Sequence, residues 1–316
     1  MMCDLEQLAE ALGERARRDE PLAPYTRMRV GGPADLLAVC HTTEEVVETV
    51  RLARTSGVPW QVLGDGCNVL VADTGVRGLV LINQAHQVQI EEGGTIWAEA
   101  GALMAALAQE TVARGLEGLE WAAGLPGTVG GAVVGNAGAF GGNVASVLTS
   151  GTVLEPSGEV VEKPNEWFEF EYRGSRIKRQ GGYLLSPSPT GAGDGGGYVV
   201  LAATFRLWSG DPQSLAVRMG EILQWRRTRH PGGATMGSTF KNPPGGHAGR
   251  LIEQAGLKGH RVGGVKVSEQ HANFLINTGG ATAADVLALI HHVQEEVERR
   301  LGVRLELEIE LVGEWG

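Results

Sequence analysis

Apolar and polar positions along the chain repeat with both helical and strand periods. The first 20 residues are charged and helix-like, and they predict an amphipathic helix that ends near Gly13 or in the charged stretch before Pro21. A strand-like run at 35–39 leads to Thr42 and Glu45, which have the spacing of a capping box. The opening therefore predicts strand, helix and strand in succession, as in an α/β arrangement.

The same two periods predict the remaining elements. Further helices are expected at 42–57, 102–114, 211–229 and 282–301, and strands at 61–63, in most of 79–100, and at 151–154, 160–162, 168–172, 199–207 and 303–311. In the last of these strands the odd positions are apolar, while the even positions from 304 to 310 are charged. The Ser-, Pro- and Gly-rich stretch 186–197 predicts an exposed loop.

Composition narrows the class of protein. With 316 residues, two or three domains are expected, and aromatic residues at 5% predict a core built mainly from aliphatic side chains. A net charge of −10 argues against a surface that binds nucleic acid or membranes. It still allows a local cationic pocket for a phosphate-bearing ligand. Three widely separated cysteines, no signal-peptide pattern and no membrane-spanning apolar run predict a cytoplasmic protein with reduced thiols.

Glycine is the most informative residue type, with 48 copies in the chain. The block 124–142 is too apolar for a flexible linker, so its backbone must pack closely against something flat or extended. Close packing of the chain on itself and a bound cofactor explain it equally well. The turn 64–68 follows a strand and could cradle a pyrophosphate, but Val69 stands where a dinucleotide fingerprint needs its third glycine. A plain tight turn is favoured, and a Rossmann site is excluded.

Single residues decide little by themselves. Arg173, at the end of a predicted strand, is typical of a surface cation. Ser238 is followed two residues later by Phe240, so it lacks the glycine of a nucleophile elbow and is typical of a loop serine. Glu308 lies on the acidic face of the last predicted strand, which indicates that its carboxylate is exposed to solvent. The histidines at 291–292 lack metalloprotease spacing, and no metal site is predicted.

Seven segments, taken in order, resemble the UDP-N-acetylenolpyruvoylglucosamine reductase family. They are RVGGPADL (29–36), LGDGCNVLVAD (63–73), GLEGLEWAAGLPGTVGGAVVGNAGAFGG (115–142), YRGS (172–175), GSTFKNP (237–243), AGRLIEQAGLKGHRVGGVKVSEQHANFLIN (248–277) and LELEIELVG (305–313). These segments are distributed along most of the chain, between residues 21 and 313. Their order makes the resemblance far more specific than any one motif.

The resemblance implies an α+β fold. An FAD-binding fold of the vanillyl-alcohol-oxidase type in two subdomains, 1–60 and 61–209, would precede a C-terminal α/β substrate-binding domain at 210–316. It also implies non-covalent FAD held by two glycine-containing segments, which decides the glycine block in favour of a cofactor. The implied contacts are Gly64, Asp65, Gly66, Cys67, Asn68, Val69, Gly124, Leu125, Pro126, Gly127, Thr128, Gly130, Gly131, Asn136, Ala137 and Gly138.

The resemblance further implies the reaction and its residues. NADPH would reduce the flavin, which would pass hydride to UDP-N-acetylglucosamine enolpyruvate and yield UDP-N-acetylmuramate for the bacterial wall. Arg173, with Glu308 in its protonated form, would stabilise the enolate, and Ser238 would protonate its carbon. The segments also imply contacts of the UDP-sugar with Tyr172, Arg229, Lys241, Asn242 and Lys258.

Some features depart from the family pattern. Cys67 stands where the family usually has serine, and Arg229 where some members have lysine. The short segment after Asn242 and the lack of an inserted subdomain after YRGS resemble the compact subclass, which lacks a tyrosine-bearing lid. An FAD-dependent alcohol or sugar oxidase of the same fold and a non-catalytic flavin- or nucleotide-sugar-binding protein are the alternatives. We expect a monomer or weak oligomer that binds small molecules and neither nucleic acid nor membrane.

Overall fold

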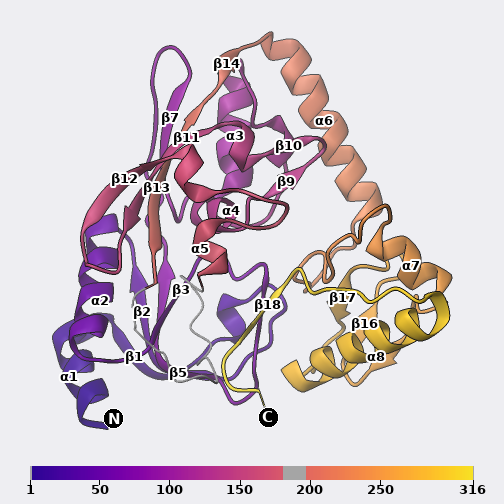
Figure 1. Cartoon of the computed structure of the whole chain (residues 1–316), viewed down its shortest axis with the longest axis horizontal. Coiled ribbons are helices and arrows are strands. Elements are labelled where there is room, and N and C mark those ends of the chain that lie inside the picture. Colours follow the sequence, from indigo (N-terminus) through magenta and orange to yellow (C-terminus); the bar gives the residue numbers. More distant parts are fainter. Residues whose placement is uncertain (1, 181–196, 316) are drawn as a thin grey trace. The chain divides into compact units, whose positions relative to one another are not determined.

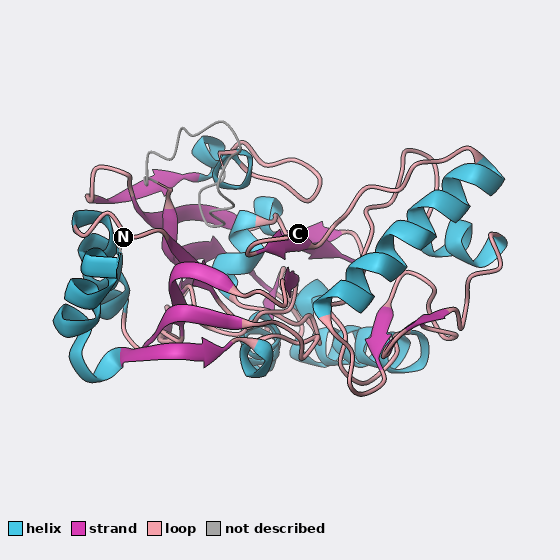
Figure 2. Ribbon diagram, turned by 90° about the horizontal axis from the view of Figure 1, so that it is seen from below, coloured by secondary structure: helices cyan, strands magenta, loops and turns pink. Residues whose placement is uncertain are grey.

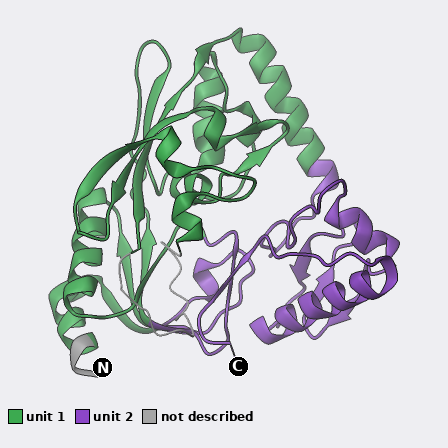
Figure 3. Cartoon of the chain, viewed as in Figure 1, with its two compact units in different colours: residues 1–19, 35–65, 78–226 green, residues 20–34, 66–77, 227–316 purple. Residues whose placement is uncertain are grey.

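The computed structural model describes residues 2–180 and 197–315, so the predicted loop at 186–197 lies, except for its last residue, outside the described residues. The chain divides into two compact units, each assembled from three separate stretches (Figure 3). Unit 1 comprises Met1–Asp19, Asp35–Asp65 and Gly78–Arg226, and unit 2 comprises Glu20–Ala34, Gly66–Arg77 and Arg227–Gly316. Both units therefore join parts of the chain that are far apart in sequence.

Figure 1 labels most of the elements, and Figure 2 distinguishes helices from strands by colour. The helices are α1 (Met2–Leu12), α2 (Thr43–Thr55), α3 (Met104–Ala113), α4 (Val129–Val134), α5 (Arg176–Arg179), α6 (Pro212–Arg229), α7 (Ala248–Gln254) and α8 (Ala283–Leu301). The strands up to the glycine block are β1 (Ala16–Pro21), β2 (Pro33–Cys40), β3 (Trp60–Leu63), β4 (Val69–Val71), β5 (Val76–Asn83), β6 (Val88–Ile90), β7 (Thr95–Glu99) and β8 (Leu116–Glu117). Those that follow are β9 (Gly138–Ala139), β10 (Gly142–Asn143), β11 (Leu148–Leu154), β12 (Val160–Pro164), β13 (Val199–Arg206), β14 (Trp208–Ser209), β15 (Arg261–Val262), β16 (Val265–Val267), β17 (Leu275–Asn277) and β18 (Glu310–Val312).

Unit 1 contains a five-stranded antiparallel sheet in the order β12-β11-β13-β7-β6. Helix α4 packs on β13 and β7, and α3 belongs to the same hydrophobic core. Fully buried side chains such as Ile96, Phe168 and Phe205 fill this core. Burying them removes apolar surface from water, which is the main stabilising term for such a layer. This layer fixes the position of α4, which begins inside the glycine block.

A second sheet lies against the first two helices. Its strand order is β1-β2-β5-β3, with β3 and β5 parallel. Helix α1 contacts α2, and both bury apolar side chains in a core shared with β2, β3 and β5. The Thr42 side chain caps α2 by accepting the Glu45 N–H at 3.2 Å.

Unit 2 has its own core beneath α8. Helix α8 packs on β15 and β16, which form a three-stranded antiparallel sheet with β17. Strand β18 pairs in parallel with β4, so the end of the chain joins a segment that follows the glycine turn at 64–68. The Asp73 carboxylate accepts the N–H groups of Ala283 and Ala284, each at 2.8 Å, at the start of α8. The fold thereby ties three distant stretches into one unit.

Most of the predicted elements are confirmed. The helices predicted at 42–57, 102–114, 211–229 and 282–301 correspond to α2, α3, α6 and α8. Thr282 and Asp285 form the capping box of α8, and Gly302 ends this helix with φ +69°. At α2 only half of the predicted capping box forms, because the Glu45 carboxylate accepts the His41 N–H instead of the Thr42 N–H.

The first helix ends at Leu12, which confirms the predicted end near Gly13, but the charged residues that follow form β1, a strand that was not predicted and whose residues are exposed or half-buried. Two predicted strands are wrong. At 168–172 there is no strand, because a 3₁₀-helix ends at Phe168 and Glu169 adopts φ +45°. Of the strand at 303–311, only Glu310 and Leu311 lie in β18, because the preceding residues bond to different segments in turn.

Among residues 2–180 and 197–315, no helix combines the length and the apolar character that crossing a bilayer requires.

Candidate active site

Within the glycine block, the start of α4 is fastened to the loop before α3. The Thr128 side chain caps α4 by accepting the Gly131 N–H at 3.4 Å. The N–H groups of the first two residues of α4, Val129 and Gly130, donate to the carbonyls of residues 102 and 100, each at 2.8 Å. A Cβ placed on Gly64 would lie 2.4 Å from Thr128 Oγ1. The first residue of the glycine turn and the first turn of α4 are therefore in close contact.

Gly131 in α4 and Gly135, which directly follows this helix, present bare backbone. Among the described residues, a Cβ on Gly131 would meet only Thr128 Oγ1, at 3.7 Å, and a Cβ on Gly135 only the Gly131 carbonyl, at 3.4 Å. Residues four apart lie on the same face of a helix. The packing of unit 1 therefore leaves one face of α4 without side chains, where a flat ligand can approach the backbone directly.

Arg173 lies at the tip of a tight turn in unit 1. Glu171 and Gly174 exchange both backbone hydrogen bonds, at 3.0 and 3.2 Å, and Arg173 adopts φ +55° between them. Its Nη1 donates to the Gly138 carbonyl at 3.1 Å, and its guanidinium lies 5.6 Å from the centre of the Tyr172 ring. Tyr172 is 58% exposed. The turn thus joins Arg173 directly to the glycine block.

Two further bonds hold this turn against the block. Asn136 donates from Nδ2 to the Glu171 carbonyl at 2.9 Å, and its Oδ1 accepts the Ala145 N–H at 3.1 Å. The buried Ser175 hydroxyl donates to the Val134 carbonyl, at the end of α4, at 2.7 Å. The predicted cofactor segment and the YRGS segment therefore form one connected structure.

The structure adds one cation that the sequence did not single out. Arg226, near the end of α6, lies with its Cδ 3.2 Å from a Cβ placed on Gly124, and its guanidinium is 5.2 Å from the centre of the Phe140 ring. Its Nε and Nη2 are buried, and among the described residues they have no hydrogen-bond acceptor. Burial lowers the pKa of this guanidinium. Only its place in an arginine-rich helix end could have indicated it in the sequence.

In unit 2, Ser238 and Glu308 lie on adjoining backbone segments. The Glu308 N–H donates to the Thr239 carbonyl at 2.9 Å, and Phe240 pairs with Leu307 in an antiparallel bridge. Both Ser238 and Glu308 are half-buried. The two residues, predicted separately from distant motifs, are thus brought together by the unit. Arg173 belongs to unit 1.

Asn68, from the glycine turn, joins the same arrangement. Its Nδ2 donates to the Glu308 carbonyl at 3.1 Å, and its own carbonyl accepts the Glu310 N–H at 2.9 Å. The last four residues of the predicted cofactor turn belong to unit 2, whereas Gly64 and Asp65 belong to unit 1. The part of the turn in unit 2 is therefore attached to the segment that carries Glu308.

The remaining predicted substrate residues lie in unit 2 but are engaged locally. Lys241 approaches Glu306 at 3.5 Å, and Lys258 pairs with Glu253 at 2.6 Å. Asn242 accepts the Ala248 N–H at 3.1 Å, at the start of α7. Arg229 is the last residue of α6. Exposed ion pairs contribute little to stability, so the lysines can exchange these partners for a ligand at low cost.

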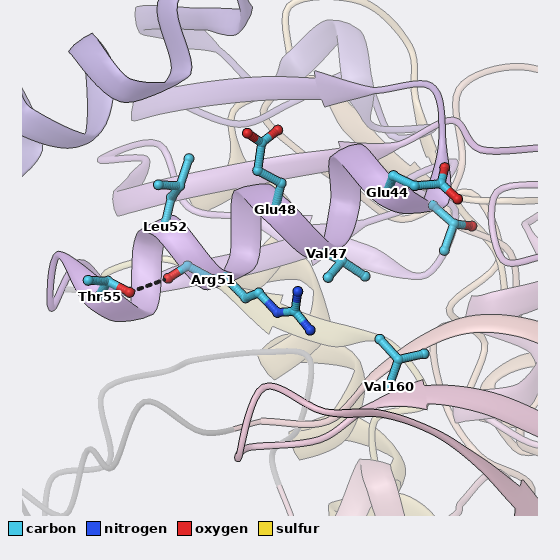
Figure 4. Close-up of a pocket in the computed structure, with 8 residues that line it drawn as sticks. Glu44, Val47, Glu48, Arg51, Leu52, Thr55 and Val160 are labelled. Carbon is cyan, nitrogen blue, oxygen red and sulfur yellow. Dashed lines mark hydrogen bonds between the residues drawn. The ribbon is translucent and has the colours of Figure 1, made fainter.

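A pocket of about 480 Å³ lies elsewhere in unit 1 (Figure 4). It is formed by one face of α2 and by Val160, and Arg51 points from α2 toward the strand that carries Val160. The Arg51 guanidinium donates to the Gly158 carbonyl at 2.6 and 3.1 Å. None of the residues predicted to bind cofactor or substrate lines this pocket.

Comparisons with known proteins agree with this arrangement. Residues 34–163 match the model of an FAD-binding domain, and residues 229–312 match that of the UDP-N-acetylenolpyruvoylglucosamine reductase C-terminal domain. The reductase of that name from Rubrobacter xylanophilus is 47% identical, covering 95% of this chain and 96% of the relative. The one from Chloroflexus aggregans is 42% identical, covering 96% of this chain and 100% of the relative.

A solved structure shows the same relationship. The crystal structure of the reductase from Thermus caldophilus superposes with a TM-score of 0.77 at 37% identity, covering 94% of this chain and 99% of that one. The predicted fold class, an FAD-binding fold followed by a C-terminal α/β domain, is confirmed.

Proposed function

Because the chain belongs to the UDP-N-acetylenolpyruvoylglucosamine reductase family, we propose that it reduces UDP-N-acetylglucosamine enolpyruvate to UDP-N-acetylmuramate, using FAD and NADPH. The structural observation that carries the proposal is the adjacency of Ser238 and Glu308, a proton donor and a carboxyl group on neighbouring segments. The reaction belongs to bacterial wall synthesis, and we expect it to take place in the cytoplasm.

The residues of unit 1 fit the expected cofactor. The bare face of α4 at Gly131 and Gly135 accommodates a flat ring system, which a side chain there would obstruct. The buried Arg226 guanidinium provides donors for an anionic group such as a diphosphate, and it lies beside Gly124 at the start of the glycine block. We propose that the block 124–138 and the turn 64–69 hold FAD. When bound, FAD supplies the hydride that it receives from NADPH.

Side chains of the protein stabilise the negative charge that develops on the substrate and supply the proton. Hydride addition to the terminal methylene leaves negative charge on the adjoining carbon and its carboxylate. Arg173 stabilises this enolate by charge-assisted hydrogen bonds, and Glu308 in its protonated form donates a further one. Ser238 then donates its hydroxyl proton to the carbon, and the basicity of the enolate makes this transfer favourable.

Cationic side chains are proposed for the other end of the substrate. Arg229, Lys241 and Lys258, with Asn242 and Tyr172, provide donors for the diphosphate and carboxylate. The overall charge of −10 does not oppose this, because local cations decide the potential at a site within a Debye length of about 10 Å. The division into domains at 1–60, 61–209 and 210–316 stays a prediction.

An anaerobic experiment in two steps tests the proposal. The yellow protein is first bleached with NADPH, and the UDP-enolpyruvyl sugar is then added without oxygen. Prompt return of the oxidised flavin spectrum is expected, and Ser238→Ala should slow only this second step. A flavin that stays reduced until air is admitted would contradict the substrate assignment and favour an oxidase.

The two alternatives are not favoured. An alcohol or sugar oxidase of the same fold does not explain the match of residues 229–312 to the reductase C-terminal domain. A non-catalytic binding protein does not explain why the segments that carry Ser238 and Glu308 are hydrogen-bonded to each other.

A further inference from the structure

We propose that Asn273 is a positioning residue for the proton transfer, because its carboxamide holds the segment that carries Ser238. The inference rests on the proposed role of Ser238 as proton donor. Asn273 was not a candidate in the sequence, where it lies in a motif without apparent chemistry. Its side chain touches neither Ser238 nor Glu308 in any contact of the described residues, so it acts through the backbone between them.

Both side-chain hydrogen bonds of Asn273 are directed at that backbone. Its Oδ1 accepts the Phe240 N–H at 3.0 Å, and its Nδ2 donates to the Phe240 carbonyl at 2.8 Å. Its own carbonyl accepts the Thr239 N–H at 2.8 Å. Asn273 is only 4% exposed, so water competes little for these bonds. One residue therefore pairs three of the four backbone polar groups of residues 239 and 240.

The other side of the same segment is bonded to Glu308. The Thr239 carbonyl accepts the Glu308 N–H at 2.9 Å, and Ser238 itself pairs with Phe274 in an antiparallel bridge. Asn273 and Glu308 thus restrain opposite sides of residues 239–240. A shift of this segment toward Glu308 must stretch the two carboxamide bonds together, and a shift away from Glu308 must compress them. Asn273 accordingly sets the distance between the proton donor and the carboxyl group.

Only an asparagine-type carboxamide can do this. A donor and an acceptor are needed on one short side chain, and leucine of similar shape provides neither. The Asn273 N–H is itself held, because it donates to His271 Nδ1 at 3.3 Å, and Phe240 is anchored in the core with 1% exposure. The carboxamide of Asn273 therefore joins two segments that are each held in place. Displacing a reacting group by about 1 Å can slow a reaction about 10²-fold.

The test compares two half-reactions in the FAD-loaded protein. Asn273→Ala should slow the anaerobic reoxidation of reduced flavin by the UDP-enolpyruvyl sugar about 10²-fold, while reduction by NADPH keeps its rate. Asn277→Ala is the matched control, since the Asn277 amide donates to the Met28 carbonyl at 3.0 Å in the same unit and touches no group of residues 238–240. This control should leave both half-reactions unchanged.

A double-mutant comparison separates positioning from mere stability. In a Ser238→Ala background, Asn273→Ala should slow reoxidation no further, because there is no hydroxyl left to misplace. An equal loss in both backgrounds, or wild-type reoxidation by Asn273→Ala while Ser238→Ala is slow, would overturn the inference alone. Normal reoxidation by Ser238→Ala would overturn the proposed role of Ser238 and this inference with it.

A second variant and a direct measurement keep the inference testable if Asn273→Ala folds poorly. Asn273→Asp keeps the acceptor for the Phe240 N–H but loses the donor to its carbonyl, so it should be slowed as well. Amide hydrogen exchange at residues 239 and 240 should accelerate in the Asn273 variants and stay unchanged in Asn277→Ala. Unaltered exchange at both amides in the Asn273 variants would show that the carboxamide does not hold residues 239 and 240, and it would overturn the inference.

Discussion

The predicted cofactor turn contains a glycine whose replacement can be assessed from distances. Gly66 is buried and has φ +58°, and a Cβ there would lie 2.1 Å from the Tyr25 carbonyl oxygen and 2.9 Å from Thr26 Cα. Both are backbone atoms, so no side-chain rotation relieves the contact. The Gly66 carbonyl also accepts the Arg27 N–H at 3.0 Å, which resists any displacement of the turn. Gly66→Ala should therefore strain the structure in two ways.

The free-energy cost of the left-handed conformation can be separated from the cost of the steric contact. A left-handed conformation costs an alanine about 1–2 kcal/mol, offset by about 0.4–1 kcal/mol from the stiffer unfolded chain. Overpacking adds about 1–3 kcal/mol. Gly57 has φ +63° with nothing within 4 Å of a Cβ, so Gly57→Ala experiences only the first term. We expect Gly57→Ala to lose about 0.5–1 kcal/mol and Gly66→Ala about 2–4 kcal/mol.

Guanidinium unfolding followed by tryptophan fluorescence measures both free energies of unfolding, and ultrafiltration measures how much flavin each variant retains. Gly66→Ala should also release flavin more readily, whereas Gly57→Ala should retain it. Equal losses of stability in the two variants would refute the steric reasoning, because they share the backbone conformation and differ in their neighbours.

Three further predictions concern other parts of the chain. Asp73→Ala should lower the free energy of unfolding by about 1–2 kcal/mol in urea, because α8 loses two bonds to a charged cap, and near-wild-type stability would show the cap to be dispensable. Arg173→Lys should slow anaerobic reoxidation by substrate about 10²-fold, since an ammonium lacks the planar fork of a guanidinium, and reduction by NADPH serves as the internal control. Burial lowers the pKa of His271, so the unfolded chain takes up this proton at a higher pH than the folded chain does. The free energy of unfolding should therefore fall as the pH drops below about 6.5, and His271→Gln should weaken that dependence between about pH 8 and about pH 5 in urea titrations.

Local structure and family membership could be predicted from the sequence alone. Helix α8 was predictable because its cap, its apolar stripe and its terminal glycine act within a few residues of one another. Ordered motifs likewise identified the FAD-binding fold and the reductase C-terminal domain. The strand at 16–21 was missed because its residues are exposed or half-buried, so hydropathy gives no strand signal.

Which distant groups come into contact became known from the fold of the whole chain. By its residue type and position alone Glu308 looked like one of several solvated carboxylates, and the family resemblance singled it out. The structure adds that its N–H pairs with the Thr239 carbonyl, beside Ser238. Asn273 gave no signal in the sequence, and Arg226 gave none beyond its place in an arginine-rich helix end, because a buried carboxamide and a buried guanidinium differ from exposed ones only in their surroundings. Periodicity reports which face of an element is buried. It carries no record of which other segment covers that face, because that pairing depends on how the whole chain closes.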